Sequence, residues 1–173
     1  VDAYRTIYEE LVKLPAEGKG TMVGYLLKNT ASLHGTVSRG VCKVKDGKLD
    51  TIQEALKVQL YPDGHLTDLD TDTDLAPDTV VSMNFWGFMP SIFPALRTYF
   101  ENFLRGLPDD AVKAECLLPL MVGEELKAGR MTVSVLHSKD LWFGMTYRED
   151  RARVAEDLRQ LHESGVYPPS LRD

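Results

Sequence analysis

The 173-residue sequence has no long hydrophobic run and no excess of positive charge. No apolar stretch approaches the roughly 20 residues that a membrane-spanning helix needs, and no signal peptide is recognisable. The net charge of −6 excludes a broad basic surface of the kind that binds nucleic acid. We therefore expect a cytoplasmic protein that binds neither nucleic acid nor membranes.

Familiar catalytic and metal-binding motifs are also missing. The two cysteines, Cys42 and Cys116, form no CxxC pair, and free thiols in a reducing compartment are the simplest interpretation. The four histidines lack metal-ligand spacing, and the G-x-S-x-G, HExxH and P-loop patterns do not occur. The motifs therefore assign no catalytic residue and no metal ligand.

The composition, 43% hydrophobic and 27% charged, is that of one ordinary globular domain. Hydrophobic periodicity predicts helices and strands that interleave along the chain, and this indicates the α/β class. The expected strands are 21–27, 40–44, 48–54, 80–89 and 131–136, and the expected helices are 2–14, 91–104, 112–127 and a last helix opened by a capping box at 146–149.

The densest apolar stretch, residues 80–90, predicts a buried strand that stops at Pro90. Side chains of a strand alternate with period two, so Asn84 and Trp86 share a face. An amide beside an indole suits a ligand with both hydroxyl groups and C–H faces. Trp86 as ordinary core and Asn84 as a hydrogen-bonded buried amide fit the same pattern.

Four segments together resemble the sugar nucleotidyltransferase family, and in particular its bacterial nucleotidyltransferase branch. The segments are RGVCKV (39–44), TIQEALK (51–57), VSMNFWGF (81–88) and WFGMTYRED (142–150). This family joins the nucleotidyl group of a nucleoside triphosphate to a sugar 1-phosphate and releases pyrophosphate. The resemblance covers nearly the whole chain, but it corresponds only to the C-terminal portion of such an enzyme.

The resemblance implies the C-terminal part of a Rossmann-like, glycosyltransferase-A-like fold, with a mixed sheet and flanking helices. Residues 1–173 would form its sugar-phosphate side, without the N-terminal half that holds the nucleotide-binding loop and a magnesium-binding aspartate. The chain opens with valine, and we expect a piece of a longer enzyme that is inactive alone. The intact parent would use Mg²⁺, a sugar 1-phosphate and an NTP, with UTP as the expected donor. Truncation would expose an apolar sheet edge and favour a homo-oligomer.

Five positions match substrate-binding residues of the family. Gly40 matches a glycine where the backbone approaches the sugar, and Glu54 a glutamate that accepts hydrogen bonds from sugar hydroxyls. Asn84 matches the sugar-binding asparagine. Lys57 stands two residues beyond the family's lysine position and is expected to contact the phosphate, provided that the strand continues. Trp86, where glycine is common, is a candidate stacking wall.

One departure concerns the metal. The family commonly has an aspartate two residues after a tryptophan, which completes the magnesium site, whereas Gly144 follows Trp142-Phe143 here. Asp140 is interpreted as a surface charge, and Glu115 as either a ligand-binding acid or a helix N-terminal charge. Two other functions stay open: a non-catalytic sugar-phosphate-binding or oligomerisation module, and a cytidylyltransferase for an alcohol phosphate such as phosphocholine.

Overall fold

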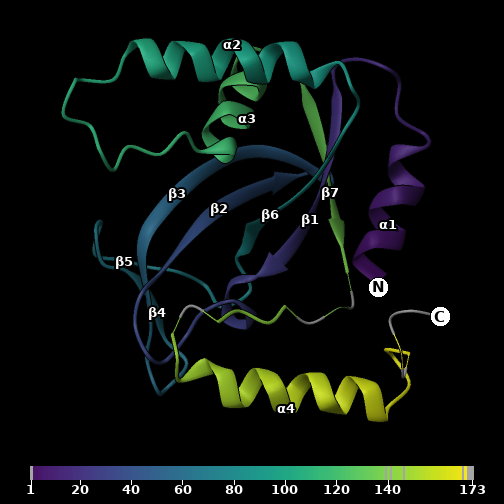
Figure 1. Cartoon of the computed structure of the whole chain (residues 1–173), viewed down its shortest axis with the longest axis vertical. Coiled ribbons are helices and arrows are strands. Elements are labelled where there is room, and N and C mark those ends of the chain that lie inside the picture. Colours follow the sequence, from purple (N-terminus) through teal and green to yellow (C-terminus); the bar gives the residue numbers. More distant parts are fainter. Residues whose placement is uncertain (1, 139, 141, 146, 169, 171–173) are drawn as a thin grey trace.

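The computed structural model describes residues 2–138, 140, 142–145, 147–168 and 170. Strands and helices interleave, which confirms the mixed α/β class with helices flanking a sheet (Figure 1). In chain order the elements are α1 (Asp2–Leu11), β1 (Lys19–Leu26), the 3-10 helix η1 (Leu27–Asn29), β2 (Val37–Lys45), β3 (Lys48–Leu60), β4 (Leu66–Asp68), β5 (Thr73–Asp74), β6 (Val80–Phe88), α2 (Ile92–Arg105), α3 (Leu118–Lys127), β7 (Thr132–His137) and α4 (Asp150–Glu163).

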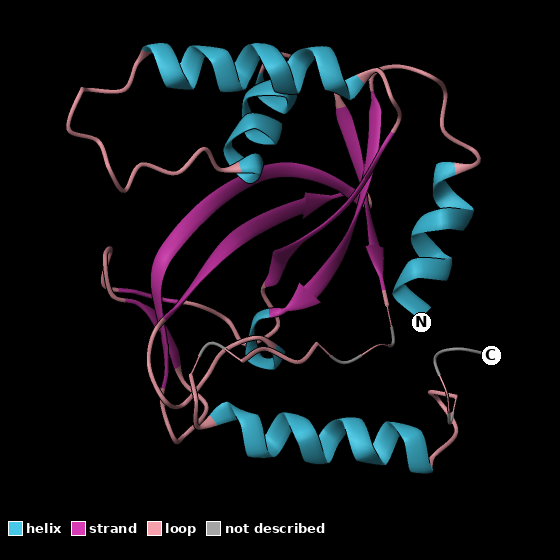
Figure 2. Ribbon diagram, viewed as in Figure 1, coloured by secondary structure: helices cyan, strands magenta, loops and turns pink. Residues whose placement is uncertain are grey.

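The sheet closes on itself (Figure 2). Strands follow the order β2-β6-β1-β7-β3, and β3 pairs back with β2, so that five strands form a barrel from which β4 and β5 extend. Among the described strands only β1 and β7 pair in parallel. Closure between β3 and β7 is narrow, with the single pair Lys48–Ser134 and a hydrogen bond of 2.9 Å from Val135 N–H to the Gly47 carbonyl. The strand order describes a closed sheet and is not plainly that of an open, Rossmann-like sheet.

The pairing of β3 with β2 closes one side of the sheet, whereas β7 meets β3 at the single pair Lys48–Ser134. The strand at the open end of the sheet order is β5, which has two exposed polar residues. A strand this short offers little template for pairing with another chain. A homo-oligomer stays a prediction.

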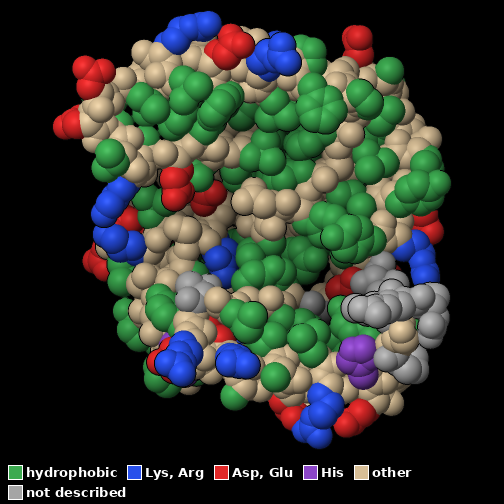
Figure 3. Space-filling view, in the orientation of Figure 1, with side chains coloured by type: hydrophobic (Ala, Val, Ile, Leu, Met, Phe, Trp, Pro, Cys, Tyr) green, Lys and Arg blue, Asp and Glu red, His purple; other side chains and the backbone are tan. Residues whose placement is uncertain are grey.

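Helices cover the sheet on different sides. In Figure 1, α2 lies along one end of the molecule with α3 beside it, α4 along the opposite end, and α1 next to β1. Met121 and Val122 of α3 join the largest apolar cluster, while Ala3 and Ile7 of α1 pack on Val23 from the other face of β1. Figure 3 shows hydrophobic side chains gathered over the region of α2 and α3 on the viewed face.

Two helices begin later than predicted. α3 begins at Leu118 rather than at residue 112, because Pro119 occupies the first turn, where its missing N–H is tolerated. α4 begins at Asp150, whose carboxylate accepts a hydrogen bond of 3.1 Å from the Tyr147 N–H. Thr146 of the predicted capping box lies outside the described residues.

Both cysteines are free, and the Cys42 thiol is buried. The pKa of Cys42 is raised to about 12, and burial is the largest of several causes. This thiol therefore stays protonated and unreactive at neutral pH. In the described ranges, no helix combines the length and the apolar character needed to cross a membrane.

Close packing across the closed sheet is testable at Gly24 of β1. A Cβ at this position would lie 2.6 Å from Val80 Cγ1 and 3.2 Å from Val135 Cγ1, on the two neighbouring strands. We expect Gly24→Ala to lower the free energy of unfolding by about 1–3 kcal/mol, as overpacked cores do. Gly123→Ala in α3 is the control, since its Cβ would meet Ile52 Cγ2 at an ordinary 3.5 Å. Urea titrations that give equal losses for both variants would contradict this packing.

Candidate functional site

Backbone register places residues of three strands in one row. Gly40 of β2 pairs with Glu54 of β3 on one side and with Ser82 of β6 on the other. Residues directly opposite each other point to the same face, so Glu54 and Ser82 flank the glycine on one side of the sheet. A Cβ at Gly40 would lie 3.1 Å from Ile52 Cδ1 and 3.3 Å from Ser82 Cβ. The glycine therefore leaves an open floor between the two side chains.

Beyond this row the ladder between β2 and β6 ends, because only Gly40–Ser82 and Val41–Val81 are paired. On its other side β6 has an irregularity, since the stretch from Ser82 to Trp86 lies opposite only Met22 to Gly24 of β1. Asn84, inside this bulge, has a φ of 56°. Asparagine is one of the few residues that tolerate this left-handed conformation. Bulges bend a strand and redirect its side chains, and this one lies at the open end of the row.

A cavity of about 220 Å³ occupies this position. Its volume is several times the roughly 30 Å³ of one water and below the roughly 300–1,000 Å³ of drug-sized pockets, which suits a small polar ligand. Three of the five predicted site residues line it, namely Gly40, Glu54 and Asn84. The full lining is Ser38, Arg39, Gly40, Glu54, Leu56, Ser82, Met83, Asn84, Glu115 and Leu117.

Glu54 is half-buried at the cavity and supplies a carboxylate. In the described part of the chain no group donates a hydrogen bond to it, and no ion pair holds it. Burial raises the pKa of Glu54 above its ordinary value, while the positive charge of Arg39 acts in the opposite direction. The cavity thus contains a strong acceptor whose hydrogen-bonding capacity is unused.

Asn84 is held by its neighbours along β6. Its backbone N–H donates to Ser82 Oγ over 3.2 Å, and its Oδ1 accepts from Trp86 Nε1 over 3.2 Å. The side-chain NH₂ group is therefore the part of the amide left to donate to a ligand. Glu54 and Asn84 together present an acceptor and a donor to one small cavity.

Trp86 does not line the cavity. Its ring stacks on Phe88, with centroids 5.8 Å apart and planes at 12°, and it packs against the apolar cluster that includes α3. Trp86 thus packs as a core residue, and its indole N–H also holds the Asn84 amide. A stacking wall for the ligand is not seen here.

Lys57 also lies away from the cavity. In the ladder between β2 and β3, Ala55 pairs with Arg39 and Val58 pairs with Val37. The stretch of β3 between these pairs is one residue longer than the stretch of β2. This bulge breaks the alternation, so Ala55 and Val58 are both buried and Lys57 is exposed. The Lys57 ammonium lies 2.7 Å from Asp70 Oδ1. Lys57 therefore does not line this cavity, and its expected contact with the phosphate stays a prediction.

Sequence patterns missed three polar residues of the lining, Ser38, Arg39 and Ser82, and left Glu115 open between two roles. Ser82 is two residues from Asn84 in the same strand, and this spacing was the available signal. Glu115 is exposed, precedes α3 by three residues, and lines the cavity. It therefore adds a second carboxylate rather than a charge in the first turn of the helix.

The described residues do not fit a magnesium site. They contain no group of three or more His, Cys, Asp or Glu side chains able to hold a metal ion. A side chain at Gly144 would collide with the Trp142 ring, whose Cη2 would lie 2.0 Å from its Cβ. Asp140 accepts a hydrogen bond of 2.8 Å from the Ala3 N–H at the start of α1. We assign no step to a metal bound by these residues.

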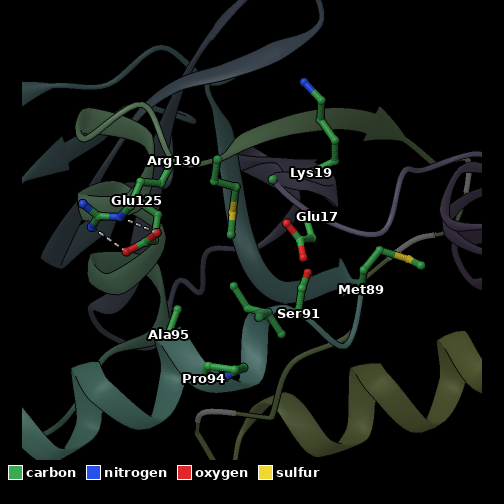
Figure 4. Close-up of a pocket in the computed structure, with 11 residues that line it drawn as sticks. Glu17, Lys19, Met89, Ser91, Pro94, Ala95, Glu125 and Arg130 are labelled. Carbon is green, nitrogen blue, oxygen red and sulfur yellow. Dashed lines mark hydrogen bonds and ion pairs between the residues drawn. The ribbon is translucent and has the colours of Figure 1, made fainter.

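A larger cavity of about 410 Å³ lies between the start of β1, the start of α2 and the end of α3 (Figure 4). Two of its charged groups, Arg130 and Glu125, are paired with each other. Arg130 donates to both oxygens of Glu125, over 2.9 and 2.7 Å, and Lys19 donates to Thr132 Oγ1 over 2.8 Å. Ser91 Oγ donates to the Ala16 carbonyl over 2.7 Å. Apart from Glu17, these side chains are bonded within the protein, and none of the predicted site residues lines this cavity, so it is the weaker candidate.

In comparisons with protein-family models and with curated proteins, the chain matches no family and no curated protein. The function of the cavity is therefore inferred from its geometry together with the resemblance carried by four segments of the sequence.

The raised pKa of Glu54 gives a prediction about stability. Because the folded chain holds this proton more tightly than the unfolded chain, the ionised carboxylate destabilises the fold at neutral pH. That cost disappears as the pH falls below the ordinary glutamate pKa. We expect Glu54→Gln to raise the melting temperature by on the order of 1–2 °C at about pH 7.5 and to leave it unchanged at about pH 4. Thermal unfolding that shows a loss at about pH 7.5 would contradict the burial effect.

The backbone at Asn84 gives a second prediction. Replacement by alanine places a Cβ in the left-handed region, which costs about 1–2 kcal/mol, whereas glycine adopts a φ of 56° freely. We expect Asn84→Ala to be less stable than Asn84→Gly by about 1 kcal/mol in chemical denaturation. Both variants lose the amide, so they are matched for side-chain chemistry. Equal stability of the two variants would show that the bulge relaxes.

Proposed function

We propose that the chain is the sugar-binding portion of a nucleotidyltransferase, with the C-terminal part of a Rossmann-like, glycosyltransferase-A-like fold. The enzyme would transfer a nucleotidyl group from an NTP, with UTP as the expected donor, to a sugar 1-phosphate and release pyrophosphate. The observation that carries the proposal is the convergence of Glu54 and Asn84, two residues predicted to bind sugar hydroxyls, on one small cavity.

The chemistry of the cavity suits a polyol. A sugar hydroxyl donates one hydrogen bond and accepts others, so neighbouring hydroxyls are satisfied by a carboxylate beside an amide NH₂. Hydrogen bonds to a charged carboxylate are among the stronger ones in proteins. The apolar side chains of Leu56, Met83 and Leu117 complete the lining and offer contacts to C–H groups.

Catalysis in this reaction depends on positioning. A phosphate oxygen of the sugar 1-phosphate attacks the α-phosphorus of the NTP, and the bond to pyrophosphate breaks, with the two oxygens in line. Fixing the sugar at Glu54 and Asn84 would orient the attacking phosphate. The residues of this chain thus bind and orient one substrate.

The sugar phosphate group itself would lie outside the cavity. No lysine lines it, and the Arg39 guanidinium is bonded to Thr30 and Ser38. The contacts to the phosphates, the NTP and the Mg²⁺ of the parent enzyme would come from the nucleotide-binding half. We therefore expect binding without turnover from this chain alone.

A second candidate follows from the charge of the cavity. Glu54 and Glu115 are both carboxylates, and among the lining residues only Arg39 is a cation. This balance favours a ligand with a positive group, and a cytidylyltransferase for an alcohol phosphate such as phosphocholine fits it. A non-catalytic module of the same fold would bind the same ligands without a reaction.

Isothermal titration calorimetry of the folded chain discriminates these candidates. We expect glucose 1-phosphate or galactose 1-phosphate to bind, and Glu54→Gln to weaken that binding about tenfold or more, because a hydrogen bond to a charged group contributes about 1.5–3 kcal/mol. Gln53→Ala is the matched control, since Gln53 is the exposed neighbour of Glu54 and does not line the cavity.

Each alternative has its own result. Binding of phosphocholine but of neither sugar phosphate would establish the second candidate. Equal binding by wild type, Glu54→Gln and Asn84→Gly would contradict the site assignment. A parent enzyme that binds sugar phosphate but forms no nucleotide sugar from any NTP would identify the non-catalytic module.

A further inference from the structure

Helix α2 carries apolar side chains on two adjoining faces. On one face, Ile92 belongs to the largest apolar cluster and Tyr99 packs against it. On the neighbouring face, Phe93, Phe100 and Leu104 are 67%, 50% and 49% exposed. Their spacing of seven and four residues aligns them along the helix, and we call these three residues the α2 stripe. Single exposed apolar residues are common, whereas an aligned group of large ones indicates a surface that contacts a partner.

Charged side chains border the α2 stripe along one edge. Arg97 and Glu101 are exposed and four residues apart, so they lie on the same flank of the helix, away from the face that packs on the core. Figure 3 shows basic and acidic side chains alternating along the outer edge of α2, beside the hydrophobic side chains of the viewed face. In the described part of the chain, Arg97 has no ion-pair partner.

This pattern of apolar and charged residues is complementary to itself. In a two-fold dimer each contact occurs twice, with the two copies exchanged. If two α2 helices run antiparallel about a midpoint at Tyr99, Phe93 of one copy comes close to Leu104 of the other. The same midpoint places Arg97 opposite Glu101 of the other copy, because both positions are two residues from it. Both residues lie on the same flank, so the two-fold axis brings opposite charges together twice.

We propose that two copies of this chain form a dimer through the α2 stripe, with two equivalent Arg97–Glu101 ion pairs that fix its antiparallel register. Burial of the stripe supplies most of the affinity, and the charges select the orientation. Arg105 of the same chain donates to Glu101 Oε2 over 3.2 Å, and Oε1 can accept from the second copy. The dimer does not depend on any ligand of the cavity at Gly40.

Sedimentation equilibrium of the full chain tests the dimer. One helix of 14 residues is a small interface, so we expect the mass to rise from one chain to two between micromolar and near-millimolar concentration. Phe93→Gln should raise the dissociation constant about tenfold or more, because each dimer loses two buried aromatic rings. Tyr8→Gln on α1 is the matched control, since Tyr8 is 66% exposed. It should leave the constant within about twofold of wild type.

Charge reversal tests the register. Arg97→Glu alone, or Glu101→Arg alone, should weaken the dimer about tenfold or more, because like charges then face each other at both equivalent contacts. Both reversals in one chain restore opposite charges and should return the dissociation constant to within about threefold of wild type. Circular dichroism checks that the helix content of each variant is unchanged, since like charges four residues apart also weaken a helix slightly.

Four results would overturn the inference. The first is a monomeric mass at every concentration, which would assign the α2 stripe to a different partner. The second and third are a dimer that Phe93→Gln leaves intact and a dimer that Tyr8→Gln disrupts, because either would place the contact elsewhere. The fourth is a double reversal that weakens the dimer as much as the two single reversals combined, because the Arg97–Glu101 pairs would then not exist.

Discussion

The double pairing of Gly40 is the constraint on which the site depends. One residue of β2 sets the register of both neighbouring strands, and it thereby brings the Glu54 carboxylate and Ser82 to the same face. Because position 40 has no side chain, the space between them stays open. The bulge that follows in β6 then turns Asn84 toward this space, at the point where β2 and β6 cease to pair.

Three residues near Gly40 lower the stability of the fold. Among the described residues, no group donates a hydrogen bond to the half-buried Glu54 carboxylate and no carboxylate bonds to the buried Arg39 guanidinium. Both features oppose folding, as does an asparagine in the left-handed conformation. Features of this kind cluster at functional sites in proteins, because selection retains them for binding or catalysis. Glu54 lies in the row with Gly40, Asn84 lies in the adjoining bulge of β6, and Arg39 precedes Gly40 in β2.

Much of the fold was predictable because the decisive signals are local. The expected strands 40–44 and 48–54 fall within β2 and β3, and the apolar stripe of residues 91–104 predicted α2. Closure of the sheet was not predictable, since it depends on the pairing of β3 with β7, which are far apart in the sequence. The exposure of Lys57 was not predictable for a related reason. A bulge in β3 shifts the alternation of side chains by one residue, and no residue type in the sequence marks that bulge.

We propose that the cavity at Gly40 binds the sugar of a sugar 1-phosphate. Titration of the ¹⁵N-labelled chain with glucose 1-phosphate or galactose 1-phosphate, followed by mapping of the amide shifts, examines this binding. We expect the largest shifts at Gly40, Glu54, Ser82 and Asn84. Shifts concentrated instead around Glu125 and Arg130, at the larger cavity, or no shifts with either ligand, would contradict it.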